Sequence, residues 1–96
     1  MVQSVTICGI PHTIVQCEDS FNTDLHFGQI DYAKCEIRLN KDLPEEAMKE
    51  TLVHEILHGI LVHLGYNNEA QNEQFVQAVS NAINQTFTLK EVQHEE

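Results

Sequence analysis

The sequence predicts an α+β fold in which a small, mostly antiparallel β-sheet packs on a long helix and a second helix follows near the C-terminal end. The first observation is that residues 1–41 are rich in short β-branched segments. The second is that apolar side chains recur at helical spacing across residues 42–65 and again across residues 70–86. Strands that precede helices in this way are typical of α+β domains. A chain of 96 residues has room for one such domain, and we expect the polar residues 90–96 to form a frayed tail.

The expected strands form two pairs. Residues 2–8 and 13–15 are separated by a Gly-Ile-Pro segment, which predicts a β-hairpin. Residues 27–32 and 35–40 form the second pair, and in the latter segment apolar and polar residues alternate as in a half-buried strand. We expect residues 35–40 to lie at the edge of the sheet, where an extended peptide can pair with the main chain.

The long helix has clear start and stop signals. Asp42 is a plausible N-cap, Pro44 can occupy an early helical position, and Glu45 completes a capping-box spacing. Gly65 suits the left-handed position that ends many helices. The helix is therefore expected to run from about residue 43 to residue 64. Its apolar arc consists of Leu52, Val53, Ile56, Leu57, Ile60 and Leu64.

Inside this helix lies an HExxH pattern, formed by His54, Glu55 and His58. Two histidines four residues apart lie one turn apart on the same helix face, so both imidazoles can bind one metal ion. Glu55 is offset around the helix, a position that suits a general base acting on a metal-bound water. The pattern predicts a zinc-dependent hydrolase and favours a peptidase.

A third ligand decides the type of site. Glu73, at the start of the second helix, would complete a set of two histidines and one glutamate, which leaves a fourth position open as in catalytic zinc sites. Glu69 is the competing candidate at the loop end of the same helix, and Asn72 is a candidate hydrogen-bonding partner of the site. His63 is not expected to bind, because it points to the opposite side of the helix from the two motif histidines. The longer metzincin pattern would also need a histidine where this chain has Leu64.

Composition excludes several classes of partner. The net charge is −10, from 15 acidic and 5 basic residues, and no Lys/Arg cluster is present to bind a phosphate backbone, so we expect no nucleic-acid partner. No apolar run approaches the length of a membrane span, and the N-terminal segment lacks the pattern of a secretory signal. Cys8, Cys17 and Cys35 are odd in number and widely spaced, which favours free thiols in a reducing compartment. The chain is therefore expected to be cytoplasmic.

At these residues the chain resembles the small zincin-like metallopeptidases of phage and prophage genomes, which are distant relatives of the ImmA/IrrE and SprT-like groups. The HExxH match is specific, whereas the strand matches are looser. The resemblance implies a minimal zincin-like fold of the gluzincin type, with His54, His58 and Glu73 as zinc ligands and Glu55 as the catalytic residue. The matching segments are residues 5–9, 27–32, 35–39, 51–58 and 72–76.

The function that we expect is hydrolysis of peptide bonds in a cytoplasmic protein or peptide substrate, by a zinc-bound water that Glu55 assists. Tyr66 and His63 are the candidates for a hydrogen-bond donor to the substrate carbonyl. The alternative is a catalytically weak or inactive zinc-binding protein that interacts with a host or regulatory protein. Both functions need the histidines, but only the enzyme needs Glu55.

Overall fold

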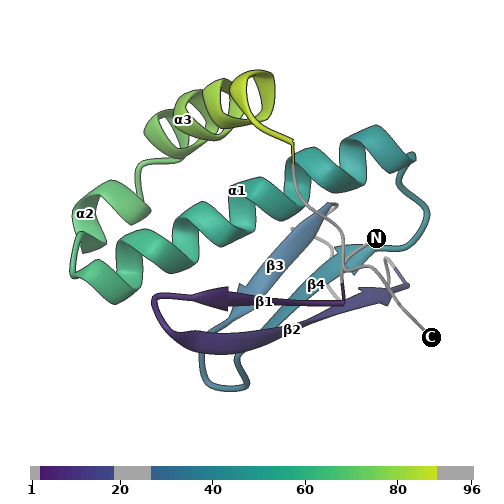
Figure 1. Cartoon of the computed structure of the whole chain (residues 1–96), viewed down its shortest axis with the longest axis horizontal. Coiled ribbons are helices and arrows are strands. Elements are labelled where there is room, and N and C mark those ends of the chain that lie inside the picture. The colour runs from purple at the N-terminus through teal and green to yellow at the C-terminus, as the bar shows by residue number, and fades with distance from the viewer. Residues whose placement is uncertain (1–2, 19–26, 89–96) are drawn as a thin grey trace.

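A computed structural model of the chain describes residues 3–18 and 27–88. The described residues fold into a sheet followed by helices, so the predicted α+β class is confirmed (Figure 1). Within these ranges, no helix has both the length and the apolar character needed to cross a membrane. The elements in chain order are β1 (Ser4–Ile7), β2 (Ile10–Cys17), β3 (Gly28–Asp31), β4 (Glu36–Asn40), α1 (Glu45–Leu64), α2 (Asn67–Ala70) and α3 (Glu73–Thr86).

The strands form one sheet in the order β1-β2-β4-β3. The pairs β1–β2 and β3–β4 are antiparallel hairpins, as predicted, whereas β2 and β4 run parallel. The parallel pairing is possible because β2 extends from Ile10 to Cys17, well beyond the predicted residues 13–15, so that it pairs with β1 and with β4. The prediction that residues 35–40 form an edge strand is wrong, because β4 lies between β2 and β3. Among the described residues, β3 is an edge strand of the sheet and contacts α1.

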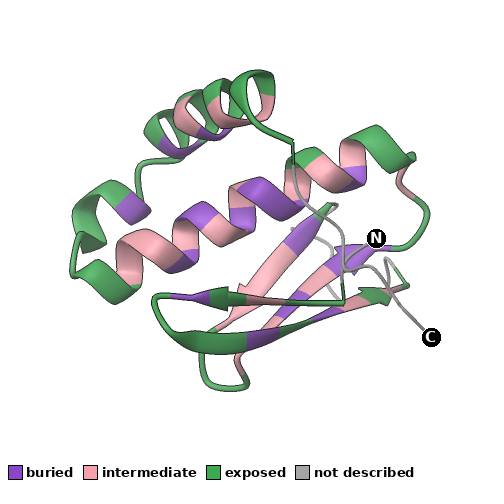
Figure 2. Ribbon diagram, in the orientation of Figure 1, coloured by how far each residue is buried: buried purple, intermediate pink, exposed green. Residues whose placement is uncertain are grey.

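Helix α1 lies between the sheet and α3, so the molecule has three layers (Figure 1). Buried residues line the facing sides of α1 and the sheet (Figure 2). Leu64, which was placed in the apolar arc of α1, is instead 60% exposed, because it lies in the last turn beyond the sheet. The core cluster consists of Ile7, Ile14, Ile37, Leu39, Met48 and Leu52.

Two glycines let α1 lie close to the sheet. A Cβ atom at Gly28 would be 2.8 Å from Thr51 Cγ2 and 2.9 Å from a backbone oxygen of β4, so no larger residue fits there without movement. A Cβ atom at Gly59 would be 3.1 Å from the terminal methyl groups of Ile7 and Ile30. Gly28 therefore sets the distance between β3 and the first half of α1, and Gly59 does the same for the second half.

The start of α1 differs from the prediction and its end agrees with it. The helix begins at Glu45 after Pro44, and no side chain caps it, so the predicted Asp42 capping box is wrong. The reason is local: the Asp42 backbone N–H donates to Asn40 Oδ1 at 2.9 Å, which holds Asp42 in the turn that follows β4. At the other end, Gly65 has φ 90° and closes the helix in the left-handed conformation, as expected.

The predicted second helix, residues 70–86, begins later than expected, and a separate short helix precedes it. Residues 67–70 form the short helix α2, and α3 begins only at Glu73. Asn72 causes this break, because its backbone is extended and its side chain accepts a hydrogen bond from the Phe75 N–H at 3.0 Å. This N-cap role replaces the predicted contact of Asn72 with the site. The prediction of a frayed tail at residues 90–96 lies outside the described residues.

Candidate metal centre

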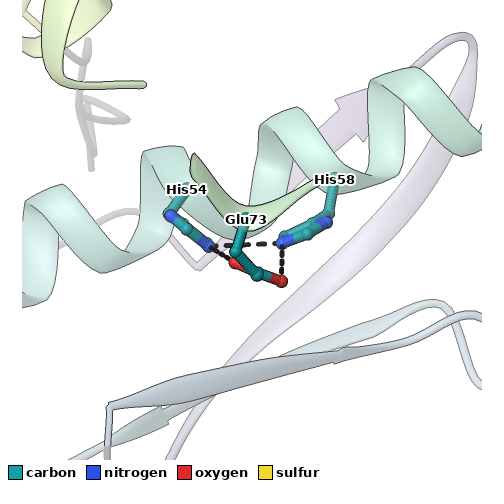
Figure 3. Close-up of side chains that lie close together, drawn as sticks. All are labelled: His54, His58 and Glu73. Carbon is teal, nitrogen blue, oxygen red and sulfur yellow. Dashed lines mark hydrogen bonds and ion pairs between the residues drawn. The ribbon is translucent and has the colours of Figure 1, made fainter. Parts of the chain in front are cut away.

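Three side chains from two helices converge at one point (Figure 3). His54 and His58 project from successive turns of α1, and their Nε2 atoms are 3.2 Å apart. Glu73, the first residue of α3, lies with Oε1 at 3.1 Å from His54 Nε2 and Oε2 at 3.2 Å from His58 Nε2. Asn72 positions this carboxylate, because it fixes the residue at which α3 begins. The predicted ligand residues are thus brought together.

The spacing of these atoms fits a shared cation. Two atoms that each lie about 2.1 Å from a tetrahedral zinc ion are roughly 3.4 Å apart. The observed separations of 3.1 and 3.2 Å are close to that value. Each ring nitrogen offers either one hydrogen or one lone pair, so hydrogen bonds alone cannot satisfy three mutual contacts. A cation accepts a lone pair from all three groups at once, so the donor set can hold a metal ion.

The other residues considered as metal ligands, Glu69 and His63, do not belong to this group. Among the described residues, the group of ligand atoms close enough to share one ion consists of His54, His58 and Glu73, and it does not include Glu69. Glu69 lies on α2 and is exposed. His63 faces away from the site, as predicted, and packs against the His12 ring with centroids 5.7 Å apart.

Glu55 lies beside the three-residue group in a different environment. It is only 8% exposed, since it belongs to the side of α1 that faces the sheet, whereas Glu73 is largely exposed. Burial first, and the negative charge of Glu73 second, raise the pKa of Glu55 to about 7. A carboxyl group with this pKa can accept and return a proton near neutral pH.

A cleft of about 740 Å³ adjoins these residues. One wall consists of β3 together with Phe27 before it and Tyr32 after it. The other wall is formed by α1 and the first half of α3. The lining includes the carboxylates of Glu50, Glu55 and Glu73, and among residues 3–18 and 27–88 no Lys or Arg contributes to it. The cleft can therefore accept a polypeptide that lies along β3. Its carboxylates disfavour an acidic polypeptide.

Neither of the two residues predicted to donate a hydrogen bond to the substrate carbonyl lines this cleft. Tyr66 precedes α2 and is 54% exposed, and His63 lies one turn past Gly59 against other rings. The tyrosine that does line the cleft is Tyr32, which follows β3 directly. The sequence contained a usable signal for it, because residues two apart in a strand share a face and Tyr32 continues the face of Ile30.

A comparison with family models matches residues 9–95 to the SprT-like family, which is related to zincin-like metallopeptidases. Neither the curated proteins nor the solved structures give a match. The SprT-like part of the resemblance is thereby confirmed, and the phage and ImmA/IrrE parts stay predictions. The match covers the whole of α1 and the convergence of His54, His58 and Glu73.

Proposed function

The chain belongs to the SprT-like family, and we propose that it is a zinc-dependent metallopeptidase that hydrolyses peptide bonds of a protein substrate in the cytoplasm. The observation that carries the proposal is the convergence of His54, His58 and Glu73 beside the buried carboxyl group of Glu55. Two histidines and one glutamate form the ligand set of hydrolytic zinc sites, in which one position stays free for water or substrate.

A zinc ion held by these residues would polarise the substrate carbonyl and lower the pKa of a water molecule. Glu55 takes a proton from that water as the oxygen bonds to the carbonyl carbon. It then transfers the proton to the nitrogen of the leaving amine as the C–N bond breaks, so the carboxylate is regenerated. The raised pKa of Glu55 supports this role, since the group must both accept and donate within one cycle.

The cleft favours an extended segment of polypeptide as substrate. β3 is an edge strand in the part of the sheet that the structure describes, and residues 27–30 with Tyr32 form one side of the cleft. A peptide can pair with this edge through main-chain hydrogen bonds, which accept many sequences. Glu50 lines the cleft on α1 one turn before His54 and has no ion-pair partner among the described residues. It therefore favours a neutral or basic side chain of the substrate at that end of the cleft.

The test of this function is Glu55→Gln in the full chain loaded with zinc, with fluorescently labelled casein as an unfolded substrate. Glutamine keeps the shape of the side chain but cannot take up a proton at neutral pH. We expect unchanged zinc content and a loss of at least about 100-fold in kcat. Glu69→Gln, an exposed change outside the cleft, is the control and should leave kcat unaltered. Equal turnover by Glu55→Gln and the wild type would refute the proposed peptidase function and favour the alternative, a zinc-binding interaction protein.

A further inference from the structure

Tyr32 is fixed at the end of β3 by the register between that strand and α1. Gly28 and Ile30 share one face of β3, and they meet α1 at Thr51 and Gly59 respectively. Tyr32, in the turn directly after the strand, meets α1 at His63. The strand and the helix thus progress in the same direction. Glu55 lies between Thr51 and Gly59 on α1, so Tyr32, next to His63, lies further along the helix than Glu55.

The Tyr32 ring contacts the ring of His63 on α1. Its centroid lies 6.3 Å from that of His63 in an edge-to-face arrangement, and His63 in turn makes an edge-to-face contact with His12 at 5.7 Å. His12 is only 1% exposed, and its Nδ1 donates to the Ile10 carbonyl oxygen at 2.8 Å. A buried and anchored ring therefore supports His63, and His63 supports Tyr32.

Tyr32 also lines the cleft that holds Glu55 and the three candidate ligands. Tyr32 is 39% exposed, so its ring is neither buried in the core nor free in solvent. Burial, and then the charge of Glu55, raise the pKa of Tyr32 above its ordinary value. The hydroxyl group is accordingly protonated at neutral pH and able to donate a hydrogen bond.

We propose that the Tyr32 hydroxyl donates a hydrogen bond to the carbonyl oxygen of the scissile peptide bond as that oxygen becomes negatively charged. The inference rests on the proposed peptidase function and adds a catalytic residue to it. The hydroxyl keeps its proton throughout: the charge on the oxygen appears when water adds to the carbon and disappears when the C–N bond breaks. A donor placed in advance stabilises this charge more than it stabilises the neutral carbonyl.

The test compares Tyr32→Phe with Tyr66→Phe, which removes the same hydroxyl from the other, exposed tyrosine of the chain. Phenylalanine keeps the ring and hence the contact with His63. In the zinc-loaded protein with casein, we expect Tyr32→Phe to lower kcat by about 100-fold with KM within about twofold of the wild type. Zinc content and melting temperature should stay unchanged. Tyr66→Phe should match the wild type throughout.

A second readout does not depend on turnover. Acetohydroxamate binds zinc through two oxygens, and its carbonyl oxygen would accept the Tyr32 hydrogen bond. Tyr32→Phe should weaken acetohydroxamate binding by about tenfold, as loss of one hydrogen bond to a charged group predicts. If the wild type cuts no casein but Tyr32→Phe still weakens binding, the peptidase function fails and the donor role of Tyr32 stands. If binding is equal in both proteins, or if only KM changes, the donor role is refuted.

Discussion

The carboxylate of Glu73 lies 3.1 Å from the imidazole of His54 although 19 positions separate the two residues in the chain. The contact joins the first residue of α3 to the middle of α1. Between them the chain reverses direction through Gly65 and then breaks its helix at Asn72. The turn and the cap thus have a functional consequence, because together they set a carboxylate opposite two histidines.

The raised pKa of Glu55 predicts a pH-dependent stability in the metal-free protein. Between the unfolded pKa of 4.5 and the folded pKa of about 7, the native state retains a proton that the unfolded state has lost. The free energy of unfolding should therefore fall as pH rises through this window. The full effect is on the order of 3 kcal/mol.

Urea unfolding in the presence of a chelator measures this effect. Glu55→Gln lacks the titrating group, so its stability advantage over the wild type should grow from pH 4.5 to about pH 8, above the folded-state pKa of about 7. Glu50→Gln, an exposed change on the same helix, should show a constant difference. An advantage of Glu55→Gln that does not vary with pH would contradict the assigned shift.

Substitution of the two close-contact glycines should have unequal effects. Gly28→Ala places a methyl group 2.8 Å from Thr51 Cγ2 and 2.9 Å from a backbone oxygen, so β3 must move away from α1. We expect a loss of about 1–3 kcal/mol, as is usual for overpacking. Gly59→Ala meets side-chain methyl groups of Ile7 and Ile30 at 3.1 Å, with no backbone atom among its nearest neighbours, and gains helix propensity of about 1 kcal/mol. Chemical unfolding should rank Gly59→Ala above Gly28→Ala, and the reverse order would show that β3 is not held by this contact.

The turn between β1 and β2 offers a stabilising change. Cys8 and Gly9 both have positive φ, 50° and 84°, as the central residues of a type I′ hairpin turn must. Cysteine adopts this conformation with strain, whereas asparagine adopts it readily. Cys8→Asn should therefore raise the free energy of unfolding by about 0.5–1 kcal/mol, and the β-branched control Cys8→Val should lower it. Equal thermal stability of the two variants would refute the turn assignment.

Local patterns predicted most of what local interactions determine. The HExxH spacing placed His54 and His58 on one face, the glycine at residue 65 ended α1, and the hairpin segments became antiparallel pairs. These features depend on helix periodicity and turn chemistry within a few residues. The convergence of Glu73 with the histidines was also anticipated, through its position at the start of a helix and through the family resemblance.

Features that depend on distant contacts were not predictable in the same way. The parallel pairing of β2 with β4 made β3 the edge strand, and strand order is not encoded in the alternation of any one segment. Asp42 has the residue type of an N-cap, but its backbone N–H donates to Asn40 Oδ1, which holds it in the turn before the helix. Tyr32 was overlooked in favour of Tyr66, because only the packing of β3 on α1 distinguishes the tyrosine in the cleft from the exposed one.

The most direct test of the metal centre is the zinc affinity of Glu73→Ala compared with Glu69→Ala, measured by calorimetric titration of chelator-treated protein. The wild type and Glu69→Ala should each bind one zinc ion per chain with the same affinity. Glu73→Ala should bind at least about 100-fold more weakly, since it leaves two histidine ligands on one helix. It should also lose the zinc-dependent rise in melting temperature at a fixed zinc concentration, because the ion no longer joins α1 to α3. Unchanged zinc affinity in Glu73→Ala, or loss of zinc from Glu69→Ala, would contradict the proposed centre.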